Sequence, residues 1–134
     1  MKQNIDPNDI EIKFGGGSPP KDEYMIDLLK GAYKHEFMVN IAIIKAEGIV
    51  PFSKFKPKLT QDHFDTYAKN DNPIYVYPKD GKFIMSDDYF SYYAKKAVNV
   101  EKFLCIVLGE ASGDYVIEKS TPFYLPPPTY EINE

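Results

Sequence analysis

The chain contains no arginine, so lysine supplies all sixteen of its strongly basic side chains. Arginine is the residue that grips phosphates and guanine edges through two parallel hydrogen bonds, whereas lysine acts as a point charge. The formal net charge is −4, and an acidic chain has no general attraction to nucleic acids or anionic membranes. We therefore expect neither direct sequence-specific binding to nucleic acid nor binding to a membrane.

Cysteine and long apolar runs are also scarce. Cys105 is the only cysteine, so an internal disulfide is excluded, and its apolar neighbours predict a buried thiol with a raised pKa rather than a nucleophile. No apolar run approaches the roughly 18 residues of a membrane-spanning helix. The first residues also lack the apolar core of a signal peptide. These features predict a cytoplasmic protein.

Aromatic residues are abundant, at 15% of the chain, although tryptophan is absent. Such a content predicts either an aromatic core or an aromatic binding surface. The length of 134 residues suits one domain with its own core. We expect an N-terminal extension with a Gly/Pro loop over 1–20, a single globular domain over 21–125 and a Pro-rich tail over 126–134.

The first half of the chain predicts a mixture of strands and helices. Alternation of apolar and polar residues predicts an edge strand at 10–14, and helical spacing of apolar residues predicts a helix over 21–34. The apolar run 37–46 fits a helix or a buried strand, and both remain open. An extended segment is expected at 49–57, and Thr60 is expected to cap a helix over 61–70.

The second half predicts a hairpin, a helix and further strands. Lys79-Asp80-Gly81 marks the turn of a hairpin that begins near residue 73. Ser86 is expected to cap a helix over 87–98, with Asp87 and Asp88 favourably placed in its first turn. The residues expected to be buried on this helix are Tyr89, Phe90, Tyr93, Ala94 and Ala97. A buried strand is expected at 102–110, and further short strands within 114–125. The fold class is therefore α/β (α+β): one small mixed sheet with flanking helices.

The order of elements from 49 to 110 resembles the domain shared by ParB-type partition proteins and sulfiredoxin. The matching pieces are "IVPFSKFKP", "NPIYVY", "DGKFIMSDDYFSYYAKKA" and "KFLCIVLGE". In that family, the turn after the second hairpin strand carries glycine, then an acidic residue or cysteine, then two basic residues. The resemblance implies that a nucleotide phosphate would lie there, against the N-terminus of the following helix.

Residues 86–90, "SDDYF", occupy this position but lack the glycine, the cysteine and the basic pair. Asp87 and Asp88 would instead repel a phosphate, at a cost of roughly 4 kcal/mol for two charges about 4 Å apart at an effective dielectric constant of 20. A metal bridge is disfavoured because neighbouring helical residues point about 100° apart. We therefore predict no catalytic residue, no metal and no cofactor at this turn.

Tyrosine and aspartate crowd the same part of the chain, which suggests an acidic, aromatic interaction surface. The residues proposed for it are Tyr75, Tyr77, Asp80, Asp87, Asp88, Tyr89 and Tyr92. We expect a non-catalytic protein that binds another protein through this surface on a degraded ParB-like scaffold. A phage or plasmid accessory that inhibits a basic, nucleic-acid-binding target would fit. The alternative is a divergent nucleotide-binding enzyme that uses a metal and Lys79, Lys82 or Lys95.

Three other motifs have simpler structural explanations. "GGGSPP" at 15–20 lacks the lysine and hydroxyl residue of a phosphate-binding loop, so a connector is expected. His63 lies between Asp62 and Asp65 in a first helical turn, which is common on helix surfaces. "PPPTY" at 126–130 matches a proline-rich motif that WW domains bind, and otherwise forms a tail.

Overall fold

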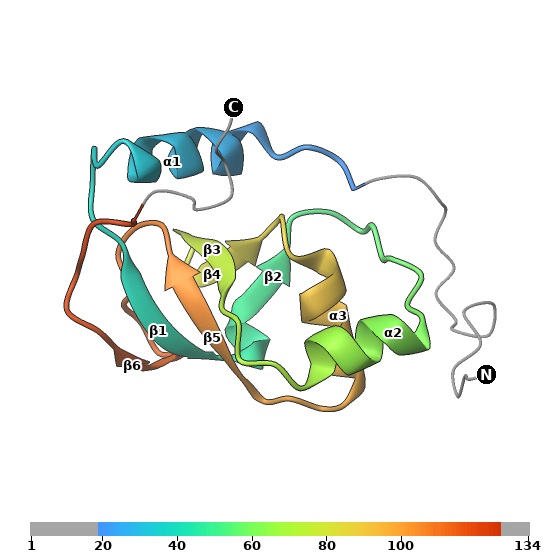
Figure 1. Ribbon diagram of the computed structural model, residues 1–134. Helices are drawn as coiled ribbons and strands as arrows, with labels where there is room; N and C mark the ends of the chain where they lie inside the picture. Colours follow the sequence, from blue (N-terminus) through green and yellow to red (C-terminus); the bar gives the residue numbers. More distant parts are fainter. Residues whose placement is uncertain (1–18, 127–134) are drawn as a thin grey trace.

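The computed structural model describes residues 19–126, which form a mixed α/β domain (Figure 1). The strands make one six-stranded sheet in the order β2-β4-β3-β5-β1-β6. In chain order the elements are α1 (Glu23–Tyr33), β1 (Asn40–Lys45), a short 3-10 turn (Ala46–Gly48), β2 (Ile49–Pro51), α2 (Gln61–His63) continued by a π-helical segment (Phe64–Ala68), β3 (Ile74–Lys79), β4 (Lys82–Met85), α3 (Tyr89–Ala97), β5 (Lys102–Val107) and β6 (Val116–Lys119). The predicted fold class, a small domain with a mixed sheet and flanking helices, is confirmed.

The helix predicted over 21–34 is present as α1, which begins two residues later, at Glu23, with Asp22 as its N-cap. The Asp22 carboxylate accepts hydrogen bonds from the backbone N–H groups of Tyr24 and Met25, at 3.1 and 3.3 Å. It also accepts a 2.8 Å bond from the hydroxyl of Tyr77 in β3. The cap therefore satisfies free amides of the first turn and joins α1 to the sheet.

The run 37–46, which the sequence left open, contains strand β1. Its residues pair antiparallel with β5 on one side and β6 on the other. β1 pairs with β5 over its whole length, from Asn40 opposite Val107 to Lys45 opposite Lys102. Its two neighbours lie far away in sequence, so local periodicity alone could not decide between helix and strand.

The predicted hairpin and the predicted cap at Thr60 are both confirmed. Asp80 and Gly81 join β3 to β4 with φ angles of 53° and 84°, the left-handed pair that a two-residue turn requires. The Thr60 hydroxyl accepts a bond from His63 N–H, and His63 Nδ1 accepts one from Thr60 N–H. The predicted strand at 102–110 is present as β5, and β6 lies within 114–125.

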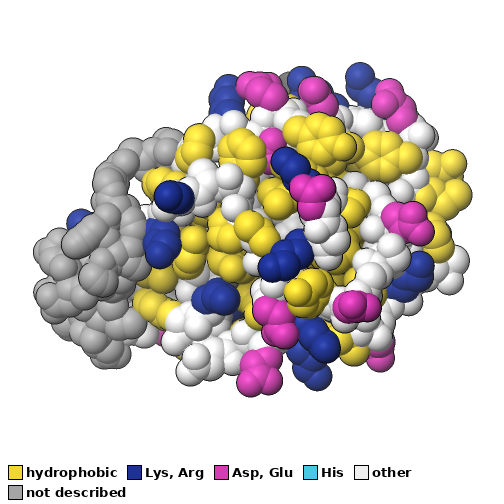
Figure 2. Space-filling view, turned by 180° about the vertical axis from the view of Figure 1, so that it is seen from behind, with side chains coloured by type: hydrophobic (Ala, Val, Ile, Leu, Met, Phe, Trp, Pro, Cys, Tyr) yellow, Lys and Arg dark blue, Asp and Glu magenta, His cyan; other side chains and the backbone are white. Residues whose placement is uncertain are grey.

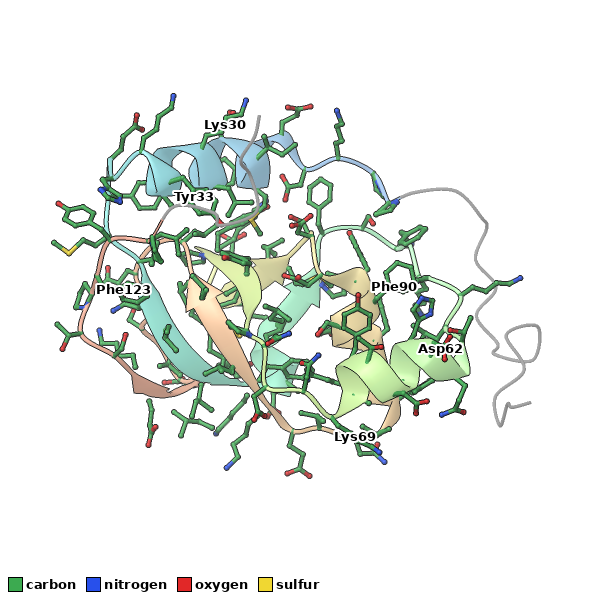
Figure 3. All side chains as sticks on the ribbon, viewed as in Figure 1. Lys30, Tyr33, Asp62, Lys69, Phe90 and Phe123 are labelled. Carbon is green, nitrogen blue, oxygen red and sulfur yellow. The ribbon has the colours of Figure 1, made fainter. Side chains whose placement is uncertain are left out.

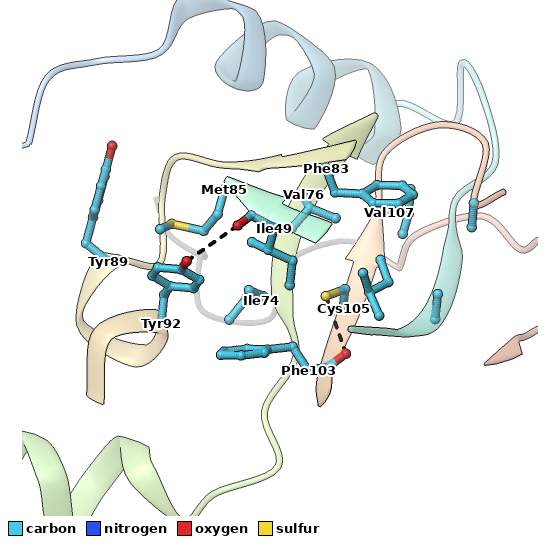
Figure 4. Close-up of a cluster of buried hydrophobic side chains, with 13 residues drawn as sticks. Ile49, Ile74, Val76, Phe83, Met85, Tyr89, Tyr92, Phe103, Cys105 and Val107 are labelled. Atoms are coloured by element: carbon cyan, nitrogen blue, oxygen red, sulfur yellow. Dashed lines mark hydrogen bonds between the residues drawn. The ribbon is translucent and has the colours of Figure 1, made fainter. Parts of the chain in front are cut away.

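Two hydrophobic clusters lie on opposite faces of the sheet. The larger one lies between the sheet and α3 and includes Cys105 and Phe103 (Figure 4). The smaller one lies beneath α1, where Met25 and Ala32 pack with Tyr77, Ile106 and Leu108. None of the helices within residues 19–126 is long and apolar enough to cross a membrane. The strand expected at 10–14, most of "GGGSPP" and nearly all of the tail lie outside the described residues.

Helix α3 differs from prediction in its start and in the face that it buries. It begins at Tyr89, with Asp88 rather than Ser86 at the N-cap position. Tyr89 and Ala94 are buried and Tyr93 is half-buried, but Phe90 and Ala97 are exposed. Tyr92 and Lys95 are buried instead. The buried stripe is rotated because α3 contacts both the sheet and the α2 segment.

Candidate interaction surface

The turn between β4 and α3 holds an unusual carboxylate. Asp88 Oδ2 accepts a 2.8 Å hydrogen bond from the backbone N–H of Tyr75. Strand pairing between β3 and β4 stops at Val76 and Met85, so Tyr75 lies one position beyond the last pair. The Asp88 side chain therefore occupies the acceptor position that a longer β4 would supply. It makes no hydrogen bond to the amides of α3, and its predicted role in the first turn of the helix is wrong.

Burial raises the pKa of Asp88 to about 6, and the neighbouring charge of Asp87 adds to the increase. The hydrogen bond from Tyr75 opposes the shift because it favours the charged form. Ser86, next to these residues, is buried, and its hydroxyl has no hydrogen-bond partner within residues 19–126. Of Ser86, Asp87 and Asp88, only Asp87 is exposed to solvent.

The tyrosines proposed for an exposed surface are largely internal. Tyr77, Tyr89 and Tyr92 expose only 4, 2 and 3% of their area, so these three rings cannot contribute to the exposed interaction surface proposed for them. Each hydroxyl has a partner inside the protein: Tyr77 donates to Asp22, Tyr89 lies 2.9 Å from Ser53 Oγ, and Tyr92 donates to the Ile49 carbonyl. These internal partners keep the hydroxyl groups of the buried tyrosines hydrogen-bonded.

The remaining members of the predicted surface do not form one patch. Tyr75 is half-buried, and its hydroxyl lies 3.4 Å from that of Tyr33 in α1. Asp80 and Asp87 are exposed but lie beyond opposite ends of β4. Asp80 also stands between Lys79 and Lys82, which pair across the hairpin. The face seen in Figure 2 likewise has lysine and acidic side chains interspersed among hydrophobic ones.

The lysines considered for a nucleotide site are not at the 86–90 turn. Lys79 and Lys82 lie at the hairpin tip, at the other end of β4 from Ser86. Lys95 is buried, and its ammonium donates to the carbonyl oxygens of Tyr67 and Asn70 at 2.9 and 2.6 Å. Lys95 therefore caps the C-terminal end of the α2 segment, which is α2 together with the π-helical residues that follow it (61–68). Burial lowers its pKa.

An aromatic contact between α2 and α3 was not predicted from the sequence. The ring of His63 lies 4.5 Å from that of Phe90, and 36% of Phe90 is exposed. Burial lowers the pKa of His63, although the charge of Asp62 opposes this shift. Figure 3 shows Asp62 and Phe90 on the same side of the molecule, beside α2. We call Asp62, His63, Asp65 and Phe90 the α2–α3 surface.

Sequence reasoning missed this surface because it placed Phe90 in the core. No local pattern links His63 to Phe90, because strands β3 and β4 separate the two helices in the chain. Within residues 19–126, no group of three or more His, Cys, Asp or Glu residues could hold a metal ion. Cys105 is fully buried, and burial raises its pKa well above the usual range, as predicted.

Comparisons with known proteins gave no match to any family model, curated protein or solved structure. The predicted order of elements over 49–110, from extended segment to buried strand, is present as β2, α2, β3, β4, α3 and β5. Membership of the ParB/sulfiredoxin-like class stays a prediction.

Proposed function

We propose that the protein is a non-catalytic interaction protein on a ParB/sulfiredoxin-like scaffold, and that it binds another protein through the α2–α3 surface. The observation that carries this proposal is Phe90, a large ring that is partly exposed and held in place against His63. Rings of this kind contribute strongly to binding because they bury a large area with few rotatable bonds.

The charges around Phe90 suggest the chemistry of the partner. Asp62 in α2 and Asp65 in the π-helical segment that follows it are both exposed, three positions apart in the chain. A lysine or arginine side chain could contact these carboxylates while its aliphatic part, or its cationic end, lies on the Phe90 ring. We therefore propose a partner segment that combines a basic residue with apolar ones, as a nucleic-acid-binding protein would offer.

Long-range charge attraction contributes little to this binding. Lys54, Lys56 and Lys58 are exposed in the loop that leads into α2, so both signs of charge border the surface. Exposed charges more than about 10 Å apart are largely screened at physiological salt. We expect the exposed ring to supply most of the binding energy, with the carboxylates selecting the partner's basic residue.

Site-specific crosslinking in the native host tests this function. A photo-reactive phenylalanine analogue at position 90 should crosslink a specific protein, whereas the same analogue at Lys30, exposed on α1, should not. The purified candidate must then bind the wild-type chain and bind at least tenfold more weakly to the Asp62→Lys/Asp65→Lys variant. Asp80→Lys, at the hairpin tip, is the matched control. Equal binding by all variants would disprove the surface.

A nucleotide-binding enzyme is the second candidate, and the Ser86 hydroxyl beside the start of α3, which has no hydrogen-bond partner among residues 19–126, favours it. A thermal-shift screen against nucleotides, with and without Mg²⁺ or Mn²⁺, separates the two candidates. A ligand at 100 times its dissociation constant stabilises the folded state by about 2.7 kcal/mol. A clear nucleotide-dependent rise in Tm would support the enzyme and contradict a purely non-catalytic role.

A further inference from the structure

A lysine-lined hollow lies between the sheet and the loop that follows the α2 segment. Its volume is about 390 Å³, within the range of small-molecule sites. Its apolar lining includes Ile43 in β1 and Leu104 in β5, which are cross-strand partners on one face of the sheet. Lys69 and Lys102, both exposed, also line it. Figure 3 shows Lys69 where the α2 segment ends.

The wall formed by residues 68–72 is built from internal hydrogen bonds. Asn70 Nδ2 donates to the Thr66 carbonyl, and Asn70 Oδ1 accepts from the backbone N–H of Asn72. The buried Lys95 ammonium, which also lines the hollow, donates to the Tyr67 and Asn70 carbonyl oxygens. A hollow with such a wall exists before any ligand arrives, so little ordering free energy is lost on binding.

The charge of the hollow is opposite in sign to that of the chain. Lys69, Lys95 and Lys102 line it, against the single carboxylate of Asp71, while the chain as a whole carries −4. Its apolar lining continues into a neighbouring hollow of about 460 Å³, which shares Ile43 and Leu104 and reaches Ile41. Apolar surface beside lysine side chains is the arrangement that an anionic molecule with an apolar body requires.

We propose that this hollow binds a small organic anion, a carboxylate with an apolar chain, independently of the partner surface on α2 and α3. The carboxylate lies between Lys69 and Lys102, and the apolar chain lies along Ile43 and Leu104. Lys95 positions the wall and does not have to contact the ligand, because its hydrogen bonds already go to the loop.

Titration of isotope-labelled full-length protein with octanoate, followed by amide chemical shifts, tests the proposal. Shifts should concentrate at Ile43, Leu104 and Asn72. The Lys69→Gln/Lys102→Gln variant should raise the apparent Kd at least fivefold, whereas Lys30→Gln on α1 should leave it unchanged. Neither variant disturbs a buried group, because Lys30, Lys69 and Lys102 are all exposed. Octan-1-ol should bind more weakly than octanoate, which isolates the contribution of charge.

Three results would overturn the proposal. One is the absence of shifts at the lining residues when octanoate is raised to its solubility limit. Another is an equal response to octanol and octanoate, because the lysines would then play no part. The third is inorganic phosphate binding as tightly as octanoate, because the apolar lining would then contribute nothing.

Discussion

Replacement of Asp88 by asparagine should change how stability depends on pH. The folded-state pKa of Asp88 is about 6, raised from 3.8 chiefly by burial. The folded protein therefore binds a proton more tightly than the unfolded chain between about pH 4 and pH 6. The stability linked to this proton is fully present below pH 4 and is lost as the pH rises through 6. Two pKa units correspond to about 3 kcal/mol.

Asparagine cannot ionise, yet its side-chain oxygen can still accept the bond from Tyr75 N–H. Asp88→Asn should therefore match or exceed the wild-type stability at pH 7.5. The difference between the two proteins should move in favour of the wild type by about 3 kcal/mol as the pH falls to 4. Urea unfolding from pH 4 to pH 8 measures this difference, and the subtraction removes the contributions of all other titrating groups.

Two further variants isolate the cause. Asp87→Asn alters an exposed neighbour, so its stability relative to the wild type should change little with pH. Asp88→Ala removes the acceptor and should cost about 1–3 kcal/mol even at pH 4, because Tyr75 N–H loses its partner. A difference in unfolding free energy between Asp88→Asn and the wild type that stays constant from pH 4 to pH 8 would refute our account of a buried carboxylate with a raised pKa.

Three other substitutions test individual contacts. Tyr77→Phe removes the hydroxyl that donates to Asp22 and should lower the free energy of unfolding by about 1 kcal/mol in urea; an unchanged value would mean that α1 does not need this bond. Lys95→Met leaves two backbone carbonyl groups without their donor and should lower the free energy of unfolding by about 2 kcal/mol, which a lower Tm would show. A rise in Tm would mean that the desolvation of the buried ammonium outweighs its hydrogen bonds. Gly48→Ala places a Cβ against the Tyr115 side chain and should cost about 1–3 kcal/mol in the same unfolding assay; a neutral result would mean that Tyr115 moves aside freely.

Features set by neighbouring residues could be predicted from the sequence. The hairpin turn needs two left-handed residues, which Asp80 and Gly81 supply. The cap at Thr60 depends only on the residues of the first helical turn. Such features are decided within four or five positions of the chain, so the sequence contains all the information that they need.

Features set by distant contacts could not be predicted in the same way. Tyr92 looked like a surface residue, but its hydroxyl reaches the Ile49 carbonyl in an edge strand 43 positions earlier. Asp88 looked like a helix-capping charge, yet it completes the hydrogen bonding of β3. The candidate surface differs from the predicted one for the same reason. The packing of α2 against α3 leaves the Phe90 ring partly exposed, and this packing joins segments that are distant in the chain.

The position of β1 inside the sheet has a consequence for synthesis on the ribosome. β1 ends at Lys45, but its partners β5 and β6 begin at Lys102 and Val116. At the usual rate of about 5–20 residues per second, the chain needs roughly 3–11 seconds to reach β5. During that interval the apolar stretch Asn40–Lys45 has no strand to pair with, whereas the hairpin of β3 and β4 can form at once. Chaperone dependence and aggregation of nascent chains should therefore depend on this stretch, and a silent codon change that slows translation between residues 46 and 101 should reduce soluble yield.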